Sequence, residues 1–131
     1  MFIVTNPQCK ICILLNTRLN MLPPTVNHMY INGRGRCFKT SECRAFQQNT
    51  TQIFTKHKNP SIQYPYVNGV KLNLIFIASN NRRWDLDNRL KAIQDCLQLS
   101  NIIKDDKQIN ELYIRRMRGF NDATLILLAG E

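Results

Sequence analysis

Residues Trp84–Gln108 read W-D-L-D-N-R-L-K-A-I-Q-D-C-L-Q-L-S-N-I-I-K-D-D-K-Q, and the rest of the chain is best understood from this stretch. The 131-residue chain has nine acidic and eighteen basic side chains, and five of the acids lie here: Asp85, Asp87, Asp95, Asp105 and Asp106. Two carboxylates about 4 Å apart repel by roughly 4 kcal/mol at an effective dielectric constant near 20. A hard divalent cation, Mg²⁺ or Mn²⁺, would compensate because such ions prefer oxygen ligands. The stretch therefore suggests a metal site within a basic surface.

The overall charge points to a polyanionic partner. The formal net charge is +9, which favours nucleic acid, although solubility alone is the simpler explanation. The apolar runs are too short to span a bilayer. The start of the sequence lacks the pattern of a secretory signal, and five cysteines fit a complete disulfide framework poorly. We therefore expect a cytoplasmic protein with reduced thiols.

Apolar periodicity predicts six elements. Strands are expected at residues 10–19, 70–78, 109–118 and 123–128, with alternation clearest in Val70–Ala78. Helices are expected from Thr40 or Ser41 to about residue 58, and from Asp87 to about Leu99. The order β-α-β-α-β-β predicts a single α+β domain in which two helices accompany a mixed sheet.

A basic segment separates the first strand from the first helix. Pro23 and Pro24 end the strand, and residues 25–39 are rich in Asn, Gly and Arg. We expect a flexible loop whose amides and arginines reach phosphates. A hairpin or a solvated excursion explains the same residues equally well.

The acidic residues admit two explanations. Asp85 and Asp87 fall between a strand and a helix, and Asp106 returns toward them only if the next strand pairs beside the preceding one. Such an arrangement would place three oxygens around an open metal site. Helix capping and a solvated turn are the alternative. The Asp85–Asp87 pair alone, or the Asp105–Asp106 turn alone, favours capping. Both together in a chain of this positive charge favour a metal site.

Lys91 lies one helical turn from Asp87 and from Asp95. These three residues could form a row of surface ion pairs, each worth a few tenths of a kcal/mol. Alternatively, Asp95 holds the Lys91 ammonium near a metal-bound phosphate. Spacing alone does not decide between the two. Trp84 could stack on a base, although a core or rim position is more common for a single tryptophan.

The cysteines give a weaker signal. Cys9 and Cys12, taken with Cys37 and Cys43, could form a zinc site, but their spacing matches no ribbon or finger. Cys96 falls on the apolar face of the second predicted helix and is expected to pack in the core.

Several motifs together resemble one family. P-P-T-V-N-H-M-Y at 23–30, R-G-R at 34–36, D-L-D-N-R-L-K-A-I-Q-D-C-L at 85–97 and D-D-K-Q-I at 105–109 are similar to the RusA family of Holliday junction resolvases. The similarity covers roughly residues 11–128. It implies a small α+β homodimer, often encoded by a phage or prophage, that cuts four-way DNA junctions with Mg²⁺ or Mn²⁺. We therefore expect residues 1–10 to be an extension and residues 11–131 to form the resolvase domain.

The resemblance also assigns roles to residues. It implies a metal-binding triad of Asp85, Asp87 and Asp106, an essential Lys91, and supporting roles for Asn88 and Asp105. The residues expected to contact DNA are Arg34, Arg36, Arg82, Arg83, Asn88, Arg115 and Arg116. The predicted function is a structure-specific endonuclease that resolves junctions by paired nicks in recombination and repair. The alternative is a basic DNA- or junction-binding protein without catalysis.

Overall fold

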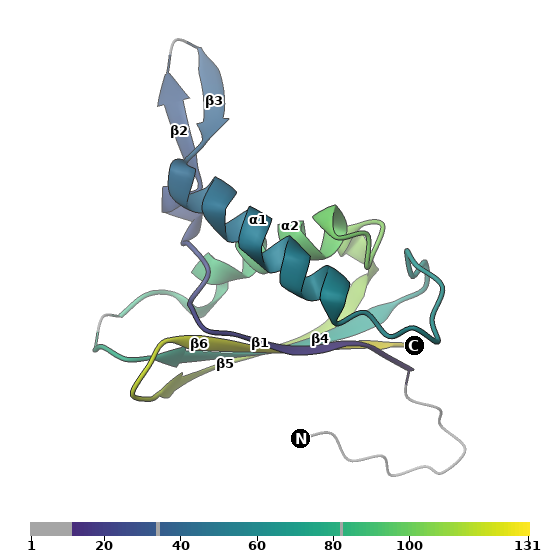
Figure 1. Cartoon of the computed structure of the whole chain (residues 1–131). Helices are drawn as coiled ribbons and strands as arrows, with labels where there is room; N and C mark the ends of the chain where they lie inside the picture. The colour runs from purple at the N-terminus through teal and green to yellow at the C-terminus, as the bar shows by residue number, and fades with distance from the viewer. Residues whose placement is uncertain (1–11, 34, 82) are drawn as a thin grey trace.

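The computed structural model describes residues 12–33, 35–81 and 83–131, which form one sheet, two helices and a hairpin (Figure 1). The strands are β1 Cys12–Leu19, β2 Tyr30–Gly33, β3 Arg36–Lys39, β4 Val70–Ala78, β5 Ile109–Arg118 and β6 Ala123–Gly130. The helices are α1 Ser41–Lys56 and α2 Leu90–Leu99, and short 3₁₀ turns occupy η1 Val26–His28, η2 Leu86–Arg89 and η3 Asp106–Gln108. In the described ranges no helix is long and apolar enough to cross a membrane.

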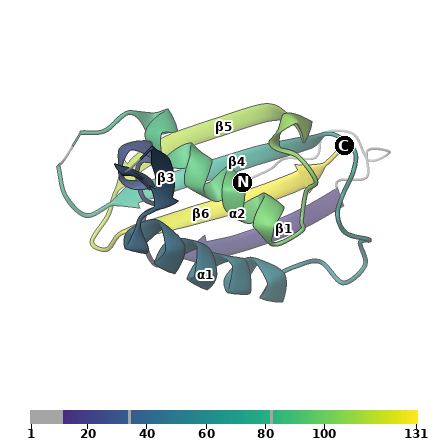
Figure 2. The ribbon, with the colours of Figure 1, turned by 90° about the horizontal axis from the view of Figure 1, so that it is seen from above.

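The main sheet has the strand order β1-β6-β4-β5, with both helices on one face (Figure 2). β4 and β5 run parallel, and the other two pairs are antiparallel. The parallel pair requires a crossover, which α2 supplies because it connects β4 to β5 across the face of the sheet. The predicted α+β class, mixed sheet and pair of helices are confirmed.

The core lies between the sheet and the two helices. On β4, Val70, Leu72, Leu74 and Phe76 are fully buried, while the side chains between them face the other side. This is the alternation expected when one face of a strand is packed. Phe54 of α1 is also fully buried and alone contributes roughly 1.5–3 kcal/mol. The packed face fixes the register of β4, and so the place where the strand delivers the chain to Asp85.

Helix α1 begins where the sequence predicts. The Thr40 side chain accepts a hydrogen bond from the Cys43 backbone N–H at 3.0 Å, and Glu42 lies in the first turn. Such a cap contributes about 1 kcal/mol. The helix ends at Lys56, two residues before the predicted limit.

Helix α2 begins later than predicted, at Leu90 instead of Asp87, because a 3₁₀ turn precedes it. The guanidinium of Arg89 donates a hydrogen bond to the carbonyl oxygen of Pro23 and lies over the Trp84 ring. These contacts anchor the residue at which the α-helix begins, so tertiary structure sets the boundary that periodicity placed too early.

The predicted flexible loop contains a β-hairpin. β2 and β3 pair from Tyr30 opposite Lys39 to Gly33 opposite Arg36, which adds two strands to the predicted order. Gly35 has a φ of 71°, a conformation that glycine adopts without strain. The hairpin alternative is therefore the correct one for this segment.

Candidate functional site

The first part of the candidate site is the pair Asp85 and Asp87, which follows β4. Both side chains are exposed, and neither makes a hydrogen bond or ion pair with a residue in the described ranges. Asp85 stands at the N-cap position of η2, yet its carboxylate caps no N–H; only its backbone oxygen accepts a bond, from Asn88 at 3.0 Å. Capping therefore does not explain Asp85, and both carboxylates are open to a cation.

Trp84 anchors this pair to the core. Its ring meets Phe76 edge-on, with centroids 5.6 Å apart and an interplanar angle of 74°. The guanidinium carbons of Arg89 and Arg116 lie 4.6 and 5.1 Å from the ring centroid, and Arg116 also donates to the Trp84 carbonyl oxygen at 2.5 Å. Trp84 is thus a rim residue that holds the acidic segment against the sheet.

The second part is the turn that contains Asp105 and Asp106. Asp105 accepts the Lys107 backbone N–H at 2.9 Å and forms a capping box with Gln108. This backbone bond is the main reason why the pKa of Asp105 lies below its usual value. Asp105 therefore shapes the turn, and Asp106 beside it is half-buried.

Gln108 holds this turn in place through four hydrogen bonds. Its side-chain oxygen accepts the backbone N–H groups of Lys104 and Asp105 at 2.8 and 2.9 Å. Its side-chain nitrogen donates to the carbonyl oxygens of Tyr66 and Asn68 at 2.6 and 2.9 Å. The last residue of the D-D-x-Q motif is thus a structural link between the turn and the loop that precedes β4.

Lys91 lies in the first turn of α2. Its ammonium donates to the Asp95 carboxylate at 3.2 Å, as the predicted ladder requires. This hydrogen bond is the largest cause of the raised pKa of Lys91, and the charge of Asp106 also raises it. Lys91 therefore stays protonated at neutral pH, with Asp95 as its partner and Asp106 in electrostatic range.

The relative position of the three aspartates follows from the sheet register. β5 does pair beside β4, as the prediction requires, with Ile109 opposite Val70 and Arg116 opposite Phe76. Asp85 is tied to the Arg116 end of β5 through Trp84, whereas Asp106 precedes Ile109 at its start, and the charge of Asp106 acts on Lys91, one helical turn from Asp87. Among the residues that the structure describes, no three His, Cys, Asp or Glu side chains gather closely enough to hold a metal. The triad therefore stays a prediction.

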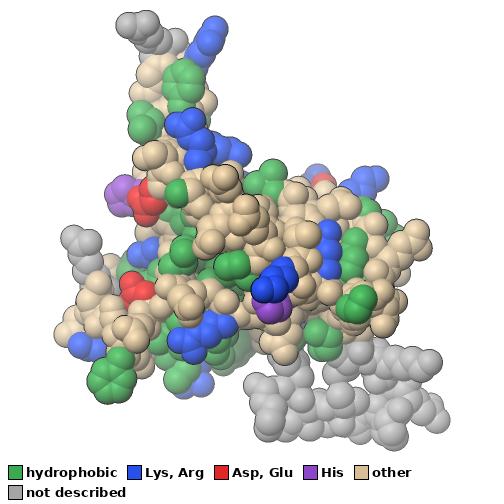
Figure 3. All heavy atoms as spheres, in the orientation of Figure 1, with side chains coloured by type: hydrophobic (Ala, Val, Ile, Leu, Met, Phe, Trp, Pro, Cys, Tyr) green, Lys and Arg blue, Asp and Glu red, His purple; other side chains and the backbone are tan. Residues whose placement is uncertain are grey.

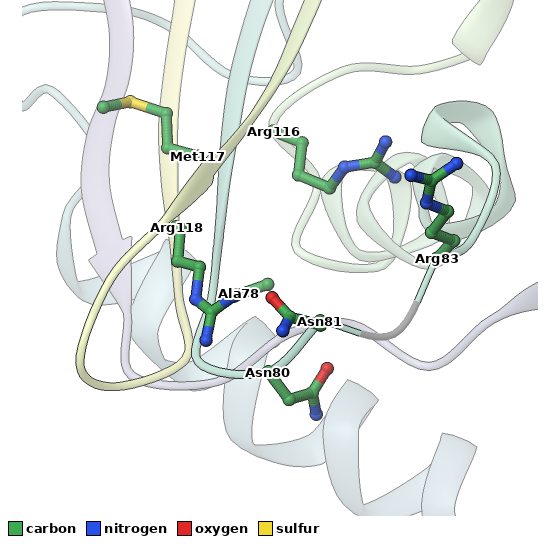
Figure 4. A pocket seen from close by; sticks show the side chains of 7 residues that line it. All are labelled: Ala78, Asn80, Asn81, Arg83, Arg116, Met117 and Arg118. Atoms are coloured by element: carbon green, nitrogen blue, oxygen red, sulfur yellow. The ribbon is translucent and has the colours of Figure 1, made fainter.

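A basic pocket of about 260 Å³ opens where β4 ends, and one of its walls is Arg83, two residues before Asp85 in the chain (Figure 4). Its walls are Ala78, Asn80, Asn81, Arg83, Arg116, Met117 and Arg118. Figure 4 shows the guanidinium groups of Arg83 and Arg116 pointing toward one another, which suits an anion between them. Sequence reasoning named these two arginines but missed Arg118, although its spacing of two from Arg116 in a strand already places both on one face.

The remaining predicted DNA contacts are dispersed. Arg115 lies on the face away from Asp85, where it lines a groove of about 680 Å³ on the open side of the sheet with Tyr113. Arg36 is exposed on β3, and Asn88 is half-buried in η2. Arg34 and Arg82 lie outside the described residues, so the structure does not place them.

Asp122 has a role that the sequence did not reveal. In the turn before β6, its carboxylate accepts the backbone N–H and the hydroxyl of Ser79 at 2.8 and 2.7 Å. These two bonds, backbone first, lower the pKa of Asp122, and the charge of Arg89 adds to the effect. Asp122 thereby fixes the end of β4, from which the acidic segment departs. In sequence it resembles any turn aspartate.

Two of the described cysteines, Cys43 and Cys96, pack in the core. Cys96 is fully buried in the core, as predicted, and burial raises its pKa to about 12. Cys12, Cys37 and Cys43 are free thiols on β1, the hairpin and α1, and with the other described side chains they form no metal cluster. Cys9, the remaining member of the considered zinc site, lies outside the described residues.

Comparisons with known proteins identify the family. The model of the family "Endodeoxyribonuclease RusA" matches residues 21–126. A crossover junction endodeoxyribonuclease RusA from Shigella sonnei is 32% identical over 95 residues, covering 72% of this chain and 77% of that protein. Proteins of the same description from Escherichia coli and Enterobacteria phage 82 are each 30% identical with the same coverage. The chain therefore belongs to the RusA family of endodeoxyribonucleases.

Proposed function

We propose that this chain resolves four-way DNA junctions with Mg²⁺ held by Asp85, Asp87 and Asp106, and that Mn²⁺ substitutes for it. The family gives the class of activity, a junction-resolving nuclease that requires a divalent metal. The observation that carries the residue assignment is the pair of exposed carboxylates, unpartnered by any described residue, beside a pocket with three arginines.

The donor set fits the metal. Mg²⁺ keeps several waters and is commonly bound by one or two carboxylates together with substrate phosphate, so Asp85 and Asp87 suffice for a first binding step. In this proposal Asp106 joins them when substrate is bound. A bound divalent cation supplies an activated water and neutralises charge on the scissile phosphate.

Lys91 is the residue of this chain proposed to act on the phosphoryl group. Its ammonium carries charge at neutral pH, and its hydrogen bond to Asp95 restricts the direction in which it points. A positioned cation of this kind stabilises charge that develops on phosphate oxygens. Asp95 is then a positioning residue that keeps Lys91 ordered between substrates.

DNA is proposed to enter along the basic surface. Arg83, Arg116 and Arg118 converge on one pocket and would hold a backbone phosphate next to Asp85. Arg36 would contact a phosphate farther along the DNA. Asn88, which lies beside Asp87 in η2, would face the same DNA strand. Arg34, Arg82 and Arg115 remain proposed contacts from the sequence. Such contacts make affinity fall steeply with salt.

A homodimer is part of the proposal. Resolution needs two symmetric cuts, and a C2 dimer presents two equivalent sites to a substrate of matching symmetry. A bacterial cytoplasm is the proposed location, and a phage or prophage origin is supported by the relative from Enterobacteria phage 82. Residues 1–10 are proposed as an extension to the resolvase domain.

The central experiment is cleavage of a labelled synthetic four-way junction. Asp85→Asn and Asp106→Asn are each expected to abolish cutting while junction binding persists, and EDTA should do the same to the wild-type protein. Glu111→Gln is the matched control, because Glu111 is an exposed acid whose charge is already paired, with Lys71 on β4 at 3.2 Å. Full cleavage by either aspartate variant would refute the assignment.

A non-catalytic junction-binding protein is the second candidate, and no structural observation favours it. Exposed carboxylates on a DNA-facing surface repel phosphate unless a cation intervenes. Junction binding without any metal-dependent product would be the result that supports it.

A further inference from the structure

The β2–β3 hairpin projects from the body of the molecule and exposes apolar side chains (Figures 1 and 3). All of its described residues are exposed, and Ile31 and Phe38 retain 58% and 50% of their accessible surface. These two residues face one another across the hairpin. An apolar pair displayed on a projection, where it adds nothing to the core, is typical of a binding surface.

The charge of the hairpin matches nucleic acid. The segment Tyr30–Lys39 contains no acidic residue. Cross-strand partners share a face, and residues two apart along a strand share it as well, so Arg36 lies on the same face as Ile31 and Phe38. An aromatic ring beside a cation is the combination that binds bases and their phosphates together.

The base of the hairpin lies against the candidate site. Burial raises the pKa of Tyr30, the first residue of β2, and the charge of Asp95 raises it further while that of Lys91 lowers it. The preceding segment is tied to the acidic region through the hydrogen bond from Arg89 to Pro23. DNA held at Lys91 would therefore run past the hairpin.

We propose that Phe38, backed by Ile31, stacks on a base at the open centre of a four-way junction and so selects branched DNA over linear duplex. In a linear duplex every base is already stacked, and inserting an apolar side chain must first open a step. A branch point interrupts the stack, so the ring finds a base face there without that cost. The inference deepens the proposed function, resting on junction recognition and not on the metal ligands.

The test is binding in EDTA, where cleavage cannot interfere and failure of the metal assignment has no effect. Fluorescence anisotropy compares a labelled four-way junction with a linear duplex of the same sequence. Phe38→Ala is expected to weaken junction binding at least about fivefold, and duplex binding less than about twofold. Phe38→Trp should retain junction binding because it keeps an aromatic face.

Two controls keep the result interpretable. Val67→Ala removes an apolar side chain that is 67% exposed in the loop before β4 and should bind both DNAs as the wild type does. Phe38→Leu keeps apolar bulk without an aromatic face and should follow Phe38→Ala. Junctions with 2-aminopurine at the branch point give a second readout, a change in emission with wild type that is smaller with Phe38→Leu.

Three outcomes would overturn the proposal. Equal weakening of junction and duplex binding by Phe38→Ala would mean that the hairpin contacts only the backbone. Wild-type junction affinity in Phe38→Leu would exclude stacking. Dissociation of an oligomer by Phe38→Ala in sedimentation velocity without DNA would show that the apolar pair contacts a second copy of the chain.

Discussion

Replacing Gln108 with alanine should destabilise the protein and disable the site through one side chain. The substitution removes four hydrogen bonds between 2.6 and 2.9 Å that join the Asp105–Asp106 turn to Tyr66 and Asn68. Each neutral hydrogen bond contributes about 0.5–1.5 kcal/mol net, and the half-buried setting favours the lower part of that range. We therefore expect a loss of about 2–3 kcal/mol.

Urea unfolding followed by circular dichroism measures this loss directly. For a chain of this size the melting temperature should also fall by roughly 8–12 °C. Gln108→Glu keeps the single oxygen that accepts both backbone N–H groups but replaces the donating nitrogen by a charged oxygen facing two carbonyl groups, so it should be at least as harmful near neutral pH as the alanine variant. Junction cleavage should drop in both, because the turn that carries Asp106 is released.

Gln98→Ala is the matched control, since Gln98 is exposed on α2 and alanine favours helix. It should change the free energy of unfolding by less than about 0.5 kcal/mol. A Gln108→Ala protein as stable as this control would refute the claim that the side chain links the two segments.

Three further predictions follow from the same geometry. Asp122→Ala should lower stability at pH 7: the pKa of Asp122 is depressed by folding, so its contribution is present above the unfolded value near 4 and is lost as pH falls through the lower folded value. Acid titration of unfolding should therefore show a difference between wild type and variant that shrinks below about pH 4. Arg118→Ala should weaken duplex and junction binding alike and reduce the dependence of log Kd on log salt by about one phosphate contact, measured by anisotropy from low to moderate salt. Asp95→Asn should reduce the rate of junction cleavage while leaving DNA affinity within about twofold. A lower pKa of Lys91 in an NMR titration of the variant would link the loss of rate to that lysine. An unchanged cleavage rate would mean that Asp95 only forms a surface ion pair.

The sequence predicted those helices and strands that bury one face, because burial produces a periodic pattern of apolar residues. β4 alternates because Leu72, Leu74 and Phe76 pack under the helices, and that pattern gave both its class and its limits. For residues 25–39 the sequence left a flexible loop and a hairpin as equal alternatives, because the described hairpin residues are all exposed and burial imposes no alternation on them. The start of α2 depends on the contact between Arg89 and Pro23, which are distant in sequence.

The sequence predicted those features of the candidate site that depend on residue type and local spacing. The carboxylate of Asp85, unpartnered by any described residue, and the hydrogen bond from Lys91 to Asp95 are the features that the motif suggested. The distance from Asp85 to Asp106 depends on the direction in which β5 pairs with β4, and spacing along the chain carries no information about that. The roles of Gln108 and Asp122 are likewise tertiary, because each binds a segment about forty residues away.

The position of Trp84 has a practical consequence. It is the chain's single tryptophan, and its indole lies within about 5 Å of two guanidinium groups, one of which belongs to the basic pocket. Indole emission responds to nearby charge, so a phosphate that draws Arg116 away would alter the emission spectrum of the unmodified protein. The site thereby carries its own optical reporter, and stopped-flow mixing with unlabelled DNA can time the arrival of a phosphate beside Asp85 separately from the cut that follows.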